Sequence, residues 1–271
     1  MTENTEHELR DEHVPGCLAL SQAANWNQNE SDWRLMLSLG HGWGLSLGGT
    51  LVASTLVLPY GSFAWISMVL VLPEHRRKGY ASRLLRVALD DLHASKLKPV
   101  LDATPAGREV YRQEGFHDTW SFKRFALRGS QVPVNGRARR PISWRKALEL
   151  DAEAFGGDRE WLLRALQKRL PDAALGTAEG FVLGRDGREA HQIGPLVARD
   201  EATALELLEQ ALGNVAAPVY VDVVDHAVRM QDWLQQRGFE FQRPFTRMVH
   251  DGGRAPGDEK LVYLVAGPEL G

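Results

Sequence analysis

The stretch Met68–Leu85, MVLVLPEHRRKGYASRLL, joins an apolar run to a basic turn and then to an amphipathic segment. Its Val and Leu residues predict a strand, and apolar residues at helical spacing predict a helix that begins near Gly79. A helix N-terminus offers unpaired N–H groups and a partial positive charge, and a glycine lets the backbone approach an anion closely. Arg76, Arg77 and Lys78 add positive charge. The stretch therefore predicts a site for an anion such as a pyrophosphate.

A second motif follows the first. Residues 100–103 read as a strand, residues 107–114 as a short helix, and the segment from Tyr111 to Phe116 has the form Y-x-x-x-G-F. Together with Arg76-x-x-Gly79-x-Ala81, this segment resembles the acetyl-CoA site of the GNAT superfamily of N-acetyltransferases. The resemblance is specific because two motifs stand in the family's order and at a suitable separation.

Other interpretations of the glycine turn are weaker. A solvated loop between a strand and a helix has a similar composition, so the turn alone is not specific. The chain has no G-x-x-x-x-G-K-[ST] and no G-x-G-x-x-G at a strand end, so neither a Walker-type triphosphatase nor a dinucleotide fold is supported. The pyrophosphate of CoA is the better-fitting anion.

The resemblance implies acetyl-CoA as the donor and an amine as the acceptor. It implies that backbone groups of Met68, Val69 and Val71 bind pantetheine and the thioester oxygen. The residues implied to hold the pyrophosphate are Arg76, Arg77, Lys78, Gly79, Tyr80, Ala81 and Ser82. Tyr111 is placed to protonate the leaving thiolate, although its ring could instead pack on the sheet.

The general base is not assigned. Histone-type members carry a glutamate six residues before the position of Val71, where this chain has Trp65, which argues against a protein-lysine substrate. For the acceptor, we expect Trp26 and Asn27 to contribute, because an indole flanked by amides can stack on a ligand and hydrogen-bond its head group. A capped helix start with a core tryptophan would explain the same cluster. Candidates for the base by residue type alone are Glu30, Asp32, His41, Glu74 and His75.

An internal repeat appears when the chain is shifted by 123 residues. The shift aligns residues 76–89 with residues 199–212 and Gly115-Phe116 with Gly238-Phe239. It also aligns Asp102 with Asp225 and Phe122-x-Arg124 with Phe245-x-Arg247. Agreement at separated places with one offset predicts two copies of one fold.

The two copies differ at the residues that matter for chemistry. Asp200, Glu201 and Ala202 take the places of Arg77, Lys78 and Gly79, and Leu234 takes the place of Tyr111. Two negative charges would repel a pyrophosphate. We therefore expect the second copy to have lost the cofactor site, and to serve either as a packing partner or as part of the acceptor site.

The expected fold class is α/β (α+β), with two tandem GNAT folds, each a mixed, mostly antiparallel sheet flanked by helices. The expected parts are a flexible N-terminus (1–13), a catalytic domain (14–129), a linker (130–141) rich in Gly, Pro and Arg, and a degenerate domain (142–271). The strands expected before the basic turn cover residues 41–49, 50–59 and 62–73.

Composition limits the remaining possibilities. The formal net charge of −3 gives no reason to expect nucleic acid or a membrane surface as a partner. The single cysteine, Cys17, excludes an intramolecular disulfide, fits a reducing compartment and is expected to be a small buried residue. No apolar run approaches the ~20 residues of a membrane span, and no signal peptide is evident, so we expect a cytoplasmic protein.

Two classes of function remain open. The first is an N-acetyltransferase that acts on the primary amine of a small molecule, without a metal and with a homodimer possible. The second is a non-catalytic acyl-CoA-binding or sensor protein, and transfer to a protein lysine is a weaker third.

Overall fold

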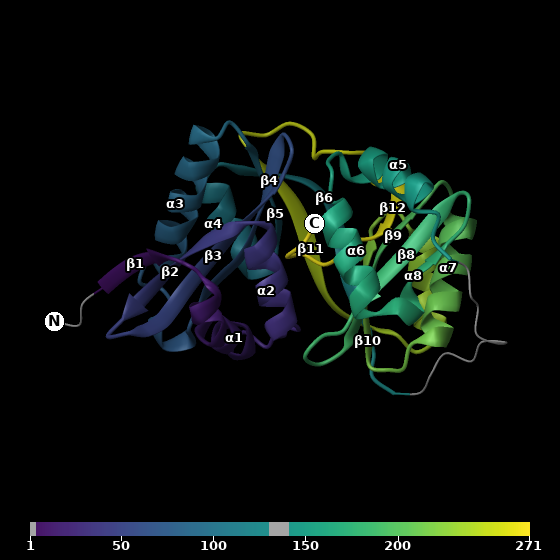
Figure 1. Ribbon diagram of the computed structural model, residues 1–271, viewed down its shortest axis with the longest axis horizontal. Helices are drawn as coiled ribbons and strands as arrows, with labels where there is room; N and C mark the ends of the chain where they lie inside the picture. The colour runs from purple at the N-terminus through teal and green to yellow at the C-terminus, as the bar shows by residue number, and fades with distance from the viewer. Residues whose placement is uncertain (1–3, 130–140) are drawn as a thin grey trace.

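The computed structural model describes residues 4–129, the first half, and residues 141–271, the second half (Figure 1). The first half follows the order expected from the sequence. Its helices are α1 (Val14–Ala23), α2 (Glu30–Leu39), α3 (Tyr80–Ala94) and α4 (Pro105–Gln113). Its strands are β1 (Asn4–Glu8), β2 (His41–Leu47), β3 (Thr50–Tyr60), β4 (Phe63–Val71), β5 (Lys98–Ala103) and β6 (Phe116–Leu127).

The second half repeats this order with its own variations. Its helices are α5 (Trp144–Phe155), α6 (Glu160–Arg169), α7 (Glu201–Asn214) and α8 (Val228–Gln236). Its strands are β7 (Leu175–Gly176), β8 (Gly180–Arg185), β9 (His191–Ala198), β10 (Val219–Val224), β11 (Glu240–His250) and β12 (Val262–Leu264). The two halves therefore repeat one order of strands and helices, as the internal repeat predicted, and their strands form a mixed, mostly antiparallel sheet.

Successive side chains of a strand point to opposite faces of the sheet, and helices pack on both faces. In β3, Leu56 and Leu58 join the core that contains α1 and α2, whereas Val57 joins the core under α3. Helix α3 covers its face with a stripe of buried side chains, Leu84, Leu85, Ala88, Leu89 and Leu92. Burying each leucine of that stripe contributes about 1.5–3 kcal/mol, so packing on the sheet holds α3 in place.

The two halves share one sheet of 12 strands, in the order β1-β2-β3-β4-β5-β11-β6-β10-β12-β9-β8-β7. The last long strand of each half leaves its own sheet: β11 lies beside β5 of the first half, and β6 lies beside β10 of the second. Figure 1 shows β11 crossing the middle of the molecule next to β6. The halves are thus joined by exchanged strands, which the sequence did not indicate.

The strand exchange is nearly symmetric. Phe245 of β11 faces Phe122 of β6, and their rings stack with centroids 5.0 Å apart. On one side of this pair Arg124 binds Asp222 at 2.7 and 2.8 Å, and on the other side Arg247 binds Asp102 at 2.9 and 3.0 Å. The expected match of Phe122-x-Arg124 with Phe245-x-Arg247 is confirmed.

The match of Asp102 with Asp225 is wrong. Asp222, three residues earlier, makes the ion pair that corresponds to the one of Asp102. Helices α3 and α7, which the offset places over one another, begin two positions apart, because the N-cap is Gly79 in α3 and Asp200 in α7. A single ungapped offset fits the buried stripes of these helices and the exchanged strands, but not every element between them.

Three local expectations concern the termini and loops, and the described residues test two of them. Residues 1–13 were expected to be flexible, but β1 pairs with β2 along its whole length and Leu9 is buried. The capped helix start that was considered for the cluster around Trp26 is present, because the side chain of Asn29 accepts a hydrogen bond from the N–H of Asp32 at the start of α2. The linker expected at 130–141 lies, except for its last residue, outside the described residues, so its boundaries stay a prediction.

The shared sheet predicts that neither half folds alone. A fragment of residues 1–129 lacks β11, the strand that bridges β5 and β6, and would expose the facing edges of both. We expect circular dichroism to show no cooperative thermal transition for this fragment, and recovery of one when a fragment of residues 130–271 is added. A cooperative transition for the isolated first fragment would contradict the exchanged-strand account.

Candidate functional site at the junction of the two halves

A gap opens between β4 and β5. The two strands are parallel and pair only from Phe63 with Lys98 to Trp65 with Val100. Beyond that point β4 runs on to Val71 and β5 to Ala103, and no strand of the described chain lies between them. Backbone groups of β4 on this side are therefore available to a ligand.

A bulge in β4 lies beside the gap. Ser54 of β3 faces Leu70, and Leu56 faces Ser67, so Met68 and Val69 have no facing residue. Met68 has a φ of 51°, a left-handed conformation that is strained for a residue with a side chain, and its carbonyl accepts a 2.8 Å hydrogen bond from the Ser54 hydroxyl. A bulge turns backbone groups away from the strand ladder. Met68 and Val69 are therefore the residues of β4 best placed to present backbone groups to the gap.

The basic turn leads from β4 to the open end of α3. Gly79 is the N-cap with a φ of 79°, and no side chain caps the helix. Arg77 is also left-handed, with a φ of 60°. The N–H groups of the first turn, formed by Tyr80, Ala81 and Ser82, therefore remain open to an anion.

The basic side chains of the turn are exposed and only loosely held. Arg76 donates through Nε to the carbonyl of Val71 at 3.2 Å, and Lys78 lies 3.4 Å from Nδ1 of His75. No acidic side chain of the described residues forms an ion pair with Arg76, Arg77 or Lys78. Their charge is thus available to a bound anion.

Tyr111 projects from α4 to the same gap. Its ring packs edge-on against Phe116 at 6.0 Å, and the space it needs is left by Gly107, where a Cβ would lie 2.9 Å from ring atom Cε2. No described residue hydrogen-bonds the hydroxyl. Burial raises the pKa of Tyr111 to about 12, so the phenol is protonated at neutral pH.

The gap widens into a pocket that both halves line, which we call the junction pocket. Of the residues expected at the site from the sequence, Met68, Val69, Tyr111 and Trp26 line it. The other lining residues are Gln28, Ile66, Ser67, Asp102, Thr104 and Arg124 from the first half, and Arg243, Phe245, Pro268 and Glu269 from the second. The second half therefore contributes four of the residues that line the pocket.

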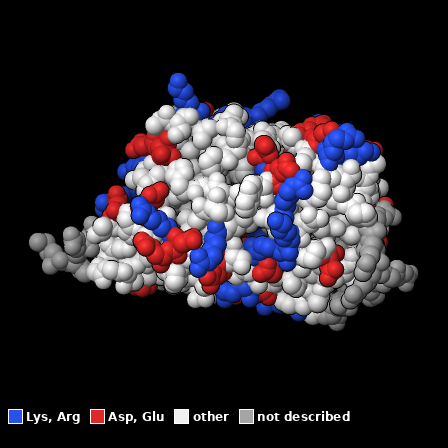
Figure 2. Space-filling view, in the orientation of Figure 1, with Lys and Arg blue, Asp and Glu red and all other residues white. Residues whose placement is uncertain are grey.

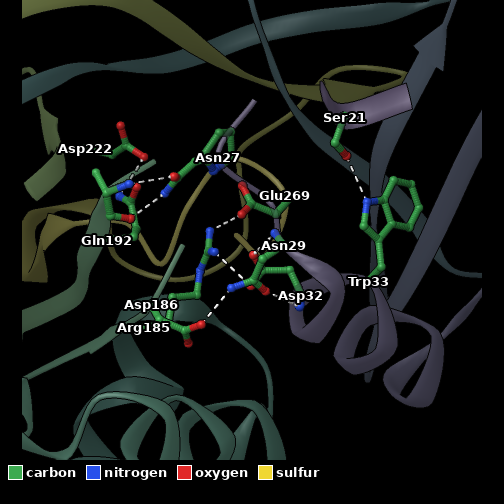
Figure 3. Close-up of polar contacts among 12 residues, drawn as sticks. Ser21, Asn27, Asn29, Asp32, Trp33, Arg185, Asp186, Gln192, Asp222 and Glu269 are labelled. Carbon is green, nitrogen blue, oxygen red and sulfur yellow. Dashed lines mark hydrogen bonds and ion pairs between the residues drawn. The ribbon is translucent and has the colours of Figure 1, made fainter. Parts of the chain in front are cut away.

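Asn27 does not belong to this pocket. Its side-chain amide donates to the carbonyl of Ala190 at 2.9 Å, and its oxygen accepts from the backbone N–H groups of Glu189 and Ala190. The residue is buried by this contact between the halves (Figure 3). The expectation that Asn27 binds the acceptor is therefore corrected, because its hydrogen bonds serve to hold the halves together.

The base candidates chosen by type lie outside the junction pocket. Glu30 pairs with Arg34 on the surface, and His41 contacts Asp91 at 2.9 Å. Asp32 is buried but is held by arginines of the second half. Glu74 and His75 form the short turn before the basic residues.

Two carboxylates line the pocket, and of these Asp102 is paired with Arg247 while the other, Glu269, lies near the C-terminal end of the sequence. Glu269 is 3% exposed and forms an ion pair with Arg185, which also binds Asp32 at 2.8 Å (Figure 3). Trp65 donates through its indole N–H to the carbonyl of Pro268 at 3.0 Å and so fixes the segment that carries Glu269. Sequence reasoning missed this residue because nothing in the sequence indicates that a segment 200 residues from β4 returns to it.

In the second half the equivalent gap is closed. β12 lies between β9 and β10, where Leu264 faces both Leu196 and Val223. The bulge of β9 repeats that of β4, but its two unpaired residues are Gly194 and Pro195, and proline has no backbone N–H. The gap is therefore filled by a strand, and one of the two N–H groups of the bulge is missing.

The start of α7 is closed as well. The carboxylate of Asp200 accepts from the N–H of Thr203 at 2.8 Å and from its hydroxyl at 2.9 Å. The side chain thus occupies the helix N-terminus with a negative charge. Of the two acidic residues of this turn, Asp200 is the one that caps the helix N-terminus, the position that is uncapped in α3.

Other groups lie apart from the junction pocket. Ligand atoms of His93, His250 and Asp251 lie within 4.8 Å of one another, near the start of β5, so these residues could hold a metal ion there. The expectation that no metal takes part in the reaction stays a prediction. Cys17 is buried as expected, and burial raises the pKa of its thiol to about 12.

The surface charge and the apolar character of the helices bear on the kind of partner that the protein could bind. On the face shown in Figure 2, acidic and basic side chains are interspersed. None of the helices in residues 4–129 and 141–271 combines the length and apolar character needed to cross a bilayer.

Comparison with known proteins supports the two-copy interpretation. The acetyltransferase (GNAT) family matches residues 6–116, and an acetyltransferase (GNAT) domain matches residues 147–264. No curated protein matches the sequence.

Solved structures of similar fold cover both halves. A candidate acetyltransferase from Pyrococcus horikoshii is 20% identical, with a TM-score of 0.83 over 99% of this chain and 96% of that one. A GCN5-related N-acetyltransferase from Sphaerobacter thermophilus is 13% identical, with a TM-score of 0.65 over 93% of this chain and 97% of that one. One from Kribbella flavida is 18% identical, with a TM-score of 0.55 over 92% and 71%. The chain belongs to the GNAT superfamily and carries two GNAT domains in tandem.

Proposed function

We propose that the protein is an acetyl-CoA-dependent N-acetyltransferase that acts on the primary amine of a small molecule. The observation that carries the proposal is the continuous path from the bulge at Met68, through the basic turn, to the uncapped N-terminus of α3. The path offers backbone groups for a thioester at one end and N–H groups for a pyrophosphate at the other. Only the first half has this path open, so we propose one cofactor site per chain.

The fit of CoA to these residues rests on their chemistry. The pyrophosphate would lie against the first turn of α3 with Arg76 and Lys78 beside it, and the pantetheine chain would lie in the gap along β4. Bound acetyl-CoA supplies the activated acetyl group. An N–H at Val69 would donate more strongly to the oxyanion of the tetrahedral intermediate than to the thioester carbonyl, which lowers the barrier.

The reaction proceeds by direct attack. The neutral amine nitrogen bonds to the thioester carbonyl carbon, the C–S bond breaks, and the Tyr111 phenol gives its proton to the departing thiolate. The amide nitrogen then loses a proton, which restores the phenol. A phenol with a pKa of about 12 is a weak acid, but the same burial raises the pKa of a thiolate beside it and so favours the transfer.

Thiol release from acetyl-CoA, measured with a panel of amines, tests the proposal. Turnover with an amine is expected. A non-catalytic acyl-CoA sensor would bind CoA and release no thiol with any amine, and a protein acetyltransferase would act on peptides and not on small amines. Either result would contradict the proposal.

Substituting Gly79→Asp is expected to weaken CoA binding about 100-fold, because it places a carboxylate at the N-terminus of α3, where its negative charge repels the pyrophosphate. Gly61→Asp is the matched control, since Gly61 has the same φ of 79° and equally open surroundings. Calorimetric titration of acetyl-CoA measures both. Equal affinities in the two variants would move the anion site away from the basic turn.

Substituting Tyr111→Phe is expected to lower kcat by roughly 10²-fold, as loss of a general acid does, with little change in CoA affinity. In the parent protein, kcat should show no loss from ionisation of this phenol at any pH up to about 11, because its pKa is about 12. Steady-state kinetics from pH 6 to 10 and calorimetry check both statements. A variant that loses only CoA affinity would refute the role as acid.

A further inference from the structure

The junction pocket holds polar atoms that are buried and have no hydrogen-bond partner among the described residues. They are Oε1 of Gln28, Oγ of Ser67, Nε of Arg243 and Oε2 of Glu269. Buried polar atoms in folded proteins are nearly always hydrogen-bonded, and leaving one unpaired costs ~1–3 kcal/mol. Four such atoms around one pocket indicate a polar ligand that satisfies them.

Glu269 is held so that one of its oxygens stays free. Oε1 binds Arg185, while Oε2 has no partner. The residue cannot easily turn away, because the carbonyls on either side of it are bound: Pro268 by Trp65 and Leu270 by the Tyr60 hydroxyl at 3.0 Å. A fixed, buried carboxylate oxygen of this kind suits a positively charged donor such as an ammonium group.

Arg243 is the opposite charge in the same pocket. It enters from β11, is half-buried, and has no ion-pair partner among the described residues. Its neighbour Arg124 is neutralised by Asp222, so that pair offers Arg243 no free carboxylate. Burial, and then the positive charge of Arg124, lower the pKa of Arg243. The negative charge of a bound ligand would offset both the burial and the repulsion by Arg124, and so would stabilise the charged form of Arg243.

We propose that the acceptor is an amine that also carries an anionic group, such as a carboxylate or a phosphate. Glu269 Oε2 binds the ammonium group and takes one proton from it, which leaves a neutral amine for attack on the thioester. Arg243 binds the anionic group and so sets the orientation of the amine. The proton on Glu269 leaves to solvent with the products, so the cycle balances. This inference rests on the proposed acetyltransferase function.

Matched pairs of acceptors test the inference. Each pair differs only in the anionic group: phenylalanine and phenethylamine, lysine and cadaverine, and glucosamine 6-phosphate and glucosamine. We expect kcat/KM for the anionic member of at least one pair to exceed that of its partner by about tenfold or more, the size of a charged hydrogen bond. Equal kcat/KM in every pair would overturn the inference.

Variants separate the two roles. Arg243→Gln should bring the ratio within a pair close to one, mainly by raising KM for the anionic member, whereas the exposed Arg254→Gln should leave it unchanged. Glu269→Gln should lower kcat at pH 7 and regain it as the pH rises and the amine arrives neutral. A loss that does not recover with pH, with CoA affinity and thermal stability unchanged, would refute the role of Glu269.

Failure of the proposed function is recognised separately. If calorimetry detects no binding of acetyl-CoA and no amine releases thiol, the acetyltransferase proposal fails and this inference fails with it. If CoA binds and amines are acetylated without regard to an anionic group, only the inference fails. Should Glu269→Gln lose its fold because Arg185 is left half-paired, the Arg243→Gln comparison still decides.

Discussion

The antiparallel pairing of β6 with β11 is the constraint on which the rest of the structure depends. The stacked pair Phe122 and Phe245 lies at its centre, and a buried arginine-carboxylate pair lies on either side. Breaking one partner of such a buried pair costs about 3–5 kcal/mol, so the exchange is hard to undo. Because β11 then lies beside β5, the second half reaches the gap of the first half and forms one wall of its pocket.

Because the two copies are nearly symmetric, the places where they differ indicate which copy can hold a phosphorylated ligand. Both copies have a bulged strand followed by a turn and a helix, yet the second has β12 in its gap, proline in its bulge and an aspartate on its helix N-terminus. Each change would disfavour a phosphorylated ligand, because it fills the gap, removes one N–H donor or places a negative charge at the helix N-terminus. The second copy instead contributes charged groups to the junction pocket, so the copies divide the proposed task between cofactor and acceptor.

Local patterns in the sequence predicted most elements, because strands and helices here follow their own hydrophobic periods. The basic turn, Gly79 and Tyr111 were also identifiable, since they belong to short motifs. What escaped prediction depends on contacts between distant segments. Asn27 was expected to bind the acceptor, but its side chain makes three hydrogen bonds to residues 189 and 190. No motif in the sequence marks Glu269 or Arg243 as a site residue. Only the strand exchange and the fold of the last segment bring them to β4.

Of the two similar turns, we propose that only the basic turn of the first half binds the cofactor. Hydrogen–deuterium exchange with and without acetyl-CoA tests it directly, because the first-turn amides of α3 have no side-chain cap and should exchange rapidly when free. We predict that acetyl-CoA protects amides of residues 68–83 and leaves those of residues 194–204 unchanged. Protection at the second segment, or at both equally, would contradict it.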